Sequence, residues 1–410
     1  MSARIQSILL LLSLASCVSY EPDETSPDII AAAVAARHGG TFSVEAAIEL
    51  AMRQNPRLRT LTARVHAADA TTTVPLPTNT ELRGRSKSIG TMVDPIALLG
   101  LGPRGAAMDT AGTRLVEAVK RLTVARWQIT ASIVEEFHVH SVLRQLRVAD
   151  IELDVDAFER SGLASPLAAL QLRAAQARAL SERIALDSAL SNNLARLRTL
   201  MALPDSAELT LLPIPDGWFQ QPEGTNAELL LRPDIALSAA KFEVADAKFK
   251  ESVAAQYPAV QIGPNVSLIG EPLRAMAMLR FPIGMYGLAE AARQHREAAR
   301  AELEEVFLNA TREASINSQQ FATTSAFANA TNAAIEASST AIQAGRIAIE
   351  VEVDAFAKFA RLATMAMHDT MENRQAAIAN ARAEVQRAVA YGWPNTQYRD
   401  DPTTMQEQQP

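Results

Sequence analysis

The sequence predicts a mainly α-helical protein with a small β part, built from long antiparallel helical hairpins and two short β-hairpins. Three observations predict this fold class. The stretch 283–393 has no proline and, after Gly287, one glycine, Gly345, before Gly392 closes it. The composition favours closely packed helices, and the same order of elements occurs twice. Proline costs a helix interior about 3 kcal/mol and glycine about 1 kcal/mol, so such a stretch favours two very long helices.

The composition is rich in alanine and poor in aromatic residues. Hydrophobic residues make up 48% of the 410 residues, but aromatic residues make up only 5%. This balance is typical of helices packed closely along their lengths rather than of a thick globular core. The net charge of −7 argues against nucleic acid as a partner, because a phosphate-binding surface needs a basic excess.

The N-terminus has the pattern of an export signal, residues 1–17. A charged start precedes a short apolar run, and the sequence Leu-Ala-Ser-Cys that ends at Cys17 resembles the lipobox of bacterial lipoproteins. Cys17 is therefore the predicted lipidation site, with a plain signal peptide or a short membrane anchor as alternatives. Val18 follows it, where an inner-membrane lipoprotein would carry aspartate, so we expect a lipid-anchored outer-membrane protein with most of its chain in the periplasm. Residues 18–40 are expected to form a polar tether.

The first repeat is predicted over residues 41–212. A helix with Ser43 as its N-cap is expected to kink or restart at Pro56. The glycine- and proline-rich stretch 74–105 predicts a β-hairpin. A long helix is then expected from Ala106 to about Arg160.

The helical hairpin of the first repeat is expected to turn at Gly162, because glycine commonly ends helices. The next helix should start at Pro166, where a missing N–H costs nothing, and run to Leu203. A proline-rich linker, 213–225, is expected to follow.

The second repeat, 226–391, shows the same order. A helix over 227–256 is interrupted near its start by Pro233, a β-hairpin is predicted over 257–283, and two long helices follow with their turn at Gly345. We expect the tail, 392–410, to be disordered. Pro56 and Pro233 lie 177 residues apart, so the pattern indicates an internal duplication rather than a short-period solenoid.

The second β-hairpin has the clearer alternation. Apolar residues occupy even positions from Val260 to Leu268 and odd positions from Leu273 to Ile283. A period of two, with one polar and one apolar face, is typical of a membrane barrel strand or a half-buried sheet strand.

This order of parts resembles the TolC-like outer-membrane efflux family (outer membrane factors). The resemblance covers about residues 41–391 and rests on the order, spacing and duplication of several short matches. These are the stretch Phe42 to Ala51 with Asn55-Pro56, the sequence Arg232-Pro233-Asp234-Ile235, the junction Phe281-Pro282-Ile283, and the Ala344-Gly345 turn.

The resemblance implies a homotrimer in which each protomer gives four strands to a shared barrel and its helices to a hollow periplasmic tunnel. Such a channel works with an inner-membrane pump and a periplasmic adaptor (membrane fusion) protein, exports small molecules or metals, and is not an enzyme. The alternative is a non-conducting periplasmic scaffold lipoprotein with a truncated barrel, because both predicted hairpins are short.

The resemblance also implies a periplasmic gate. The acidic residues Glu350, Glu352 and Asp354 follow the predicted turn at Gly345, where carboxylates of the three protomers would form rings. The alternative is a solvated helix face, which is what most charge runs are.

No enzyme motif in the sequence has the context that it needs. The GxGxxG match at 100–105 precedes a helix far too long for a dinucleotide-binding crossover. His138 and His140 are two residues apart and point to different sides of a helix. We therefore expect no catalytic residue, no metal site and no cofactor.

Overall fold

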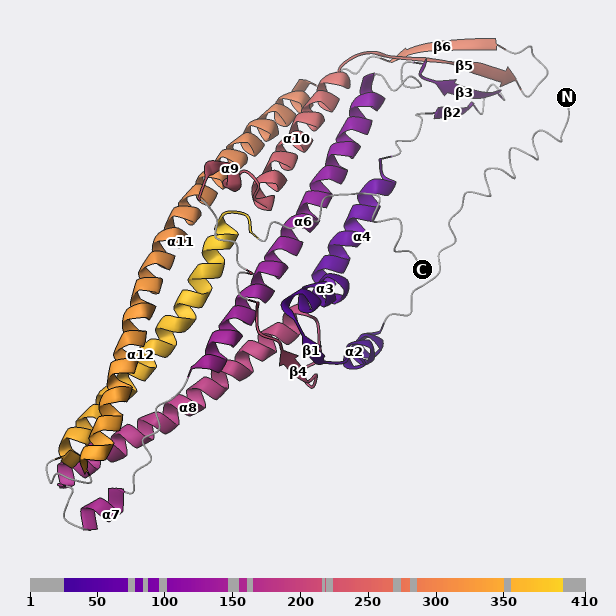
Figure 1. Cartoon of the computed structure of the whole chain (residues 1–410). Coiled ribbons are helices and arrows are strands. Elements are labelled where there is room, and N and C mark those ends of the chain that lie inside the picture. The colour runs from indigo at the N-terminus through magenta and orange to yellow at the C-terminus, as the bar shows by residue number, and fades with distance from the viewer. Residues whose placement is uncertain are drawn as a thin grey trace.

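The molecule is elongated, with long helices side by side and a β-sheet at one end (Figure 1). The computed structural model describes residues 26–72, 78–83, 88–95, 102–146, 155–160, 165–215, 218, 224–267, 274–280, 286–349 and 355–393.

The first half of the chain forms α3 (Val44–Gln54), α4 (Pro56–Ala70), α6 (Gly102–Gln145), α7 (Val155–Arg160) and α8 (Pro166–Leu200). The hydroxyl of Ser43 accepts a hydrogen bond from the N–H of Ala46 and caps α3, as predicted. Pro56 is the first residue of α4 and separates it from α3. Pro166 likewise opens α8, behind the N-cap Ser165.

The second half forms α9 (Asn226–Leu229), α10 (Pro233–Ala254), α11 (Tyr286–Ile349) and α12 (Ala355–Ala390). Pro233 separates α9 from α10, which confirms the predicted interruption. The 64 residues of α11 give a helix of roughly 96 Å at 1.5 Å per residue. The order predicted for the second repeat is therefore present.

The two predicted β-hairpins form one antiparallel sheet of four strands, in the order β2 (Thr78–Arg83), β3 (Ser88–Val93), β5 (Ala259–Ser267) and β6 (Arg274–Arg280). The pairing of β3 with β5 joins the two halves of the chain, with Ser88 opposite Ser267 and Val93 opposite Ile262. The predicted extended segment 96–101 lies outside the described residues.

A second, smaller pairing was not predicted. Strand β1 (Gly40–Phe42) runs parallel to β4 (Leu209–Leu211) and ties the start of the first repeat to its end. A Cβ atom added at Gly39 would lie 1.9 Å from the carbonyl oxygen of Glu208, so only glycine allows the two backbones to approach this closely.

The predicted tether, 18–40, contains a helix, α2 (Pro27–Ala35). Ser26 caps it, Pro27 occupies its first position, and alanines fill much of its length. The same start signals, a serine N-cap followed by proline, begin α8. The prediction of a tether over 18–40 was therefore wrong for this stretch, although the sequence contained the signals of a helix.

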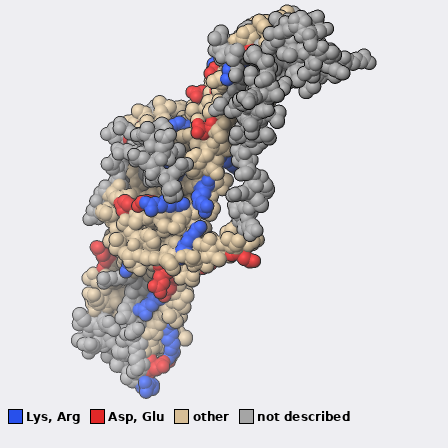
Figure 2. Space-filling view, turned by 90° about the vertical axis from the view of Figure 1, so that its right-hand side faces the viewer, with Lys and Arg blue, Asp and Glu red and all other residues tan. Residues whose placement is uncertain are grey.

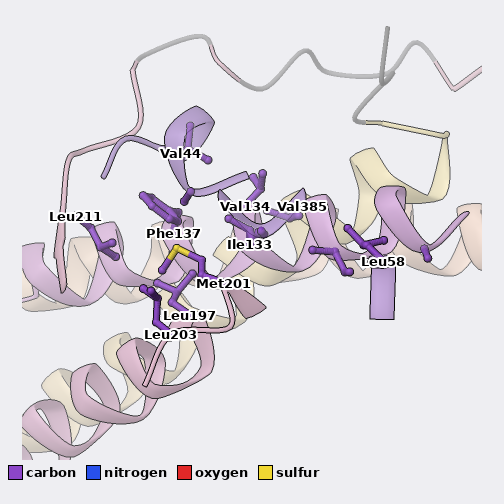
Figure 3. Packing of buried hydrophobic residues seen from close by; sticks show 14 of the residues in the cluster. Val44, Leu58, Ile133, Val134, Phe137, Leu197, Met201, Leu203, Leu211 and Val385 are labelled. Carbon is purple, nitrogen blue, oxygen red and sulfur yellow. The ribbon is translucent and has the colours of Figure 1, made fainter. Parts of the chain in front are cut away.

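The largest apolar core lies in the middle of the molecule, where α3, α4, α6, α8 and β4 meet (Figure 3). Its side chains include Val44, Leu58, Ile133, Phe137 and Met201, all of which are almost completely buried. Leu122 and Ile129, which lie seven residues apart on α6, also belong to it. Towards the end of the molecule away from the sheet the helices pack through a thinner, alanine-rich cluster.

Two predicted boundaries need correction. Helix α6 ends at Gln145, not near Arg160. Leu143 is the last buried residue of α6, Arg144 and Gln145 are exposed, and Leu146 after the helix still packs against the cluster around Leu143. The predicted tail begins too early, because Gly392 is buried and Trp393 packs against the central core.

Candidate functional site

Most of the predicted site residues lie outside the described residues. These are Cys17, Gly162, Glu350, Glu352 and Asp354. In the sequence, the three acidic residues lie between the end of α11 at Ile349 and the start of α12 at Ala355, and their role in a gate stays a prediction.

Gly345 is not itself the turn. Helix α11 continues through it to Ile349, so the change of direction comes after residue 349. A Cβ atom at Gly345 would lie 3.3 Å from Phe359 and 3.5 Å from Leu362, both on α12. The glycine therefore allows α11 and α12 to pack closely near the C-terminal end of α11 and the N-terminal end of α12. This close packing accounts for a glycine at position 345 as well as a turn would.

The same end of the molecule is held together by apolar and charged contacts. Phe356 and Phe359 of α12 pack with Leu172 of α8. Arg173 of α8 contacts Asp156 and Glu159 of α7, each at 2.6 Å. The hydrogen bond from Arg173 lowers the pKa of the Asp156 carboxyl, so this ion pair persists in mildly acidic solution.

A buried polar seam joins α6 to α8. Asn193 of α8 donates hydrogen bonds to the backbone oxygen of Glu136 at 2.8 Å and to its carboxylate at 2.7 Å. Its own amide oxygen lies 3.1 Å from Nδ1 of His140, and Arg196 binds the other oxygen of the Glu136 carboxylate at 3.1 Å. Because each polar group has a partner, the seam specifies how the two helices align.

Burial changes the charge states along α6. It raises the pKa of the Glu135 carboxyl, although Arg382 of α12 lies 3.5 Å away and opposes the shift. Burial also lowers the pKa of His140, which favours the neutral ring. His138, on another side of α6, pairs with Glu384 of α12 at 3.1 Å. The two histidines thus have separate partners and do not form a metal pair.

Arg232 forms a second junction, which the sequence did not reveal as a buried site. Its guanidinium group binds Asp234 at 2.7 Å, Glu313 of α11 at 2.9 Å and the carbonyl oxygen of Ala390 at the end of α12 at 2.9 Å. It also lies 5.6 Å from the ring centre of Trp127 on α6. Burial alone would lower the pKa of Arg232, but the hydrogen bonds and charge of Asp234 and Glu313 raise it.

All three tryptophans of the chain lie around this junction and the central core. Trp127 donates a hydrogen bond to the carbonyl oxygen of Trp393 at 3.1 Å. Trp393 packs edge to face on Trp218 at 5.3 Å between ring centres, and Trp218 donates to Glu45 at 2.7 Å. In a chain with few aromatic residues, the sparse tryptophans were the one signal that could have located this region.

Strands β5 and β6 present an apolar face to solvent. The register places Val260 opposite Leu279 and Ile262 opposite Ala277, so these four side chains share one face of the sheet. Ile262 and Leu279 are about half exposed, whereas Gln261, on the other face, is buried and its amide oxygen has no hydrogen-bond partner among the described residues. The predicted alternation is present in β5, with Ile262 on the exposed face, but the other face also carries an apolar residue, Met278, opposite Gln261.

Other kinds of site find little support in the described part of the chain. No group of three or more His, Cys, Asp or Glu side chains is placed there to hold a metal ion. None of the helices in the described ranges is both long and apolar enough to cross a membrane. Acidic and basic side chains both occur along the face shown in Figure 2, among broad uncharged areas.

No protein-family model matches this chain, and no curated protein matches its sequence. Solved structures match its fold. The outer membrane channel CmeC of Campylobacter jejuni has a TM-score of 0.69 at 12% identity, over 89% of this chain and 88% of that chain. A membrane protein from Pseudomonas aeruginosa has a TM-score of 0.67 at 17% identity, over 85% and 92%.

The outer membrane channel MtrE of Neisseria gonorrhoeae, in its open state, has a TM-score of 0.66 at 15% identity, over 85% of this chain and 88% of that chain. The chain therefore has the fold of these outer-membrane channels over most of its length, which confirms the predicted fold class.

Proposed function

We propose that this protein is the outer-membrane channel subunit of a tripartite efflux system, a passive conduit that exports small molecules or metals and carries out no reaction. The observation that carries the proposal is the outward apolar face of the sheet. A strand pair that exposes Ile262, Ala277 and Leu279 while it buries Gln261 is inverted relative to a sheet in water. It suits a sheet with lipid outside and a polar interior.

The open edges of the sheet support an assembly. Strands β2 and β6 are the outer strands among those described, and each leaves one side of its backbone unpaired. In hydrocarbon, unpaired backbone groups cost several kcal/mol each, so such a sheet must close with others. A barrel of four strands from each of three protomers satisfies this requirement.

The helical layer also has two incomplete borders. Helix α11 packs mainly on α10 and α12, and it exposes Leu308, Ile316 and Phe327 (Figure 1). Helix α8 exposes Leu167, Leu170, Leu180 and Ile184. The two borders differ, so contact between them is head-to-tail, the type of interface from which closed rings of copies are built. This supports a homotrimer whose helices enclose a tunnel.

In this assembly the end of the molecule away from the sheet faces the periplasmic adaptor protein and, through it, an inner-membrane pump. Glu350, Glu352 and Asp354 would line the narrow end of the tunnel there and favour cations. Lipid chains on Cys17 would hold the protein in the outer membrane, since several chains anchor stably where one does not.

Single-channel recording on the purified full chain tests the proposal. We expect a trimer by mass photometry in detergent and stepwise ion conductance after insertion into a planar bilayer. A double substitution, Ile262→Arg with Leu279→Arg, should abolish insertion, because arginine on a lipid-facing strand costs about 2–4 kcal/mol at the bilayer midplane. Ile29→Arg, at an exposed position of α2 that lies on neither the sheet nor the α8 and α11 borders, is the matched control. A monomer that never conducts would favour the scaffold alternative.

Two further measurements address the predicted site residues. Replacing Glu350 and Asp354 together by alanine should lower the preference for cations, whereas the same recording with Glu336→Ala should change little. Metabolic labelling with a radioactive fatty acid should mark the wild-type chain and not Cys17→Ser. Equal ion selectivity, or label in both chains, would remove the corresponding assignment.

A further inference from the structure

We propose that α12 carries a binding site for a soft monovalent metal ion, Cu(I) or Ag(I), formed by the thioethers of Met365 and Met371 and the imidazole of His368. The site lies on the surface of the helical body, outside the polar seam and the Arg232 junction. It is separate from the proposed channel function, and its test does not measure transport.

The first observation is that the side chains of Met365, His368 and Met371 are unusually exposed to solvent. Met365 is 61% exposed and Met371 is 36% exposed, and the side chain of His368 between them is 60% exposed. Within the described ranges, Met108 is the other methionine that is clearly exposed. Methionine normally fills gaps in cores, so a thioether left in water contributes nothing to packing. Met367, on the same turn, is almost fully buried and shows where methionine serves packing.

The spacing brings the three groups together. Residues 365, 368 and 371 follow one another at intervals of three and lie within about 120° of the helix circumference. Side chains three apart on a helix have Cβ atoms about 5–6 Å from each other. Methionine has three flexible side-chain torsions, so both sulfur atoms can reach an ion held at the central imidazole.

The hydrogen bond of His368 is the second observation. Its Nε2 atom lies 3.0 Å from the carboxylate of Glu372, one turn further along α12. If Nε2 carries the proton that this bond needs, Nδ1 keeps its lone pair free for a metal ion. Histidines that bind metals usually have a carboxylate on the other ring nitrogen in this way, which orients the ring and makes it a stronger ligand.

The donor set selects the ion. Two thioethers and one neutral imidazole are soft or intermediate ligands, which favour Cu(I) over Mg²⁺, Ca²⁺ or Mn²⁺. A group of His, Asp and Glu alone would favour Zn²⁺ instead, but the described residues include no such group of three. The carboxylate of Glu372 adds a negative charge beside the site. This negative charge balances the positive charge of a bound monovalent cation.

Silver tests the proposal without redox chemistry. The purified full chain is titrated with Ag(I) by isothermal titration calorimetry, and bound silver is counted by elemental analysis after gel filtration. Met365→Leu with Met371→Leu keeps the side-chain volume but removes both sulfur atoms, and His368→Gln removes the ring nitrogen. We expect each variant to lose one bound Ag(I) per chain, or to bind that ion at least tenfold more weakly.

Matched controls separate the site from other sulfur atoms. Met108→Leu removes an exposed methionine elsewhere, Met367→Leu removes the buried neighbour, and neither should change the silver count. Cys17 is present in every variant, so its contribution cancels. Circular dichroism confirms that each variant folds. An unchanged count and affinity in the double variant would overturn the proposal, as would a site that survives without the thioethers and prefers Zn²⁺.

Discussion

Helices α6 and α11 hold the same place in the two repeats, yet their surroundings differ. Helix α6 packs on α3, α4, α8, α10 and α12, and its buried residues include Leu122, Ile133 and Phe137. Helix α11 packs mainly on α10 and α12, and most of its buried residues are alanines, such as Ala310 and Ala314. The first long helix is therefore an interior element and the second is a border.

The difference shows that duplication preserves the order of elements but not their roles. An interior helix needs apolar side chains on several sides, and α6 has them up to Leu143, two residues before its end at Gln145. A border helix can continue to Ile349 with small residues on one face and leave large apolar residues for another copy of the chain. We expect substitutions in the two helices to act on different processes, folding for α6 and assembly for α11.

The largest expected effect separates these two processes. Ile133→Ala removes a fully buried side chain of α6 and should lower the free energy of unfolding by roughly 2–5 kcal/mol. Leu308→Ala removes a side chain of α11 that is 67% exposed, and it should change the stability of the monomer by less than about 0.5 kcal/mol. Guanidinium unfolding followed by circular dichroism measures the first quantity, and mass photometry should show that only Leu308→Ala weakens the trimer without unfolding it. Equal losses of stability would contradict the assignment of interior and border.

The next effect concerns the junction that connects the two helices. Arg232→Met should destabilise the protein by about 1–3 kcal/mol, because it leaves Asp234 and Glu313 without their partner while both carboxylates keep access to water. Arg232→Lys retains the charge but not the planar fork, so it should recover only part of the loss. Tryptophan fluorescence gives a second readout, since Trp127 lies beside the guanidinium group. Equal stability of the Met and Lys variants would mean that packing, not the ion pairs, holds the junction.

A smaller effect compares one glycine in each long helix. A Cβ atom at Gly112 of α6 meets nothing within 4 Å, so Gly112→Ala should stabilise the protein by about 0.5–1 kcal/mol. The same change at Gly345 of α11 brings a Cβ atom to 3.3 Å from Phe359, and the helix-propensity gain should be offset. Thermal unfolding of the two variants side by side measures the difference. A similar gain at both positions would show that α12 can move away from Gly345 without cost.

The smallest expected effect is a pH dependence of stability that arises from buried groups of α6. His140 has a lowered pKa in the folded protein, so its contribution to stability is present above its ordinary pKa and is lost as the pH falls through the folded value. Glu135, with a raised pKa, acts in the opposite direction and gains on acidification. His140→Gln keeps a donor for Asn193 but cannot titrate. The wild type should therefore lose stability relative to this variant between pH 7.5 and pH 5.5, and a constant difference would exclude His140 as the cause.

Local signals predicted a large part of the fold. Pro56, Pro166 and Pro233 open helices where expected, because proline is tolerated in a first turn and not in a helix interior. The alternation of apolar residues from Val260 and from Leu273 predicted which side chains share a face, because a strand has a period of two. The candidate gate, Glu350, Glu352 and Asp354, lies outside the described residues and stays a prediction.

Contacts between distant segments were beyond such reasoning. The parallel pairing of β1 with β4 joins residues about 170 apart, and no local pattern in either three-residue strand predicts it. Arg232 is typical of a solvated residue by type alone, and its burial follows from Glu313, Ala390 and Trp127, which three different helices bring to it. Asn193 is equally inconspicuous in the sequence, yet it is the centre of the polar seam.

The sequence by itself determined the order of elements, their duplication, the breaks at proline and the apolar parity of the strands, because these depend on the backbone and on neighbours within a few residues. Only the tertiary structure decided which long helix is interior and where α6 ends. It also decided that α12 leaves little space for a side chain at position 345, and that Ile262 and Leu279 lie on the exposed face of the sheet. Each of these depends on which surfaces meet across the chain, and the free energy of burial belongs to the pair of surfaces rather than to either segment.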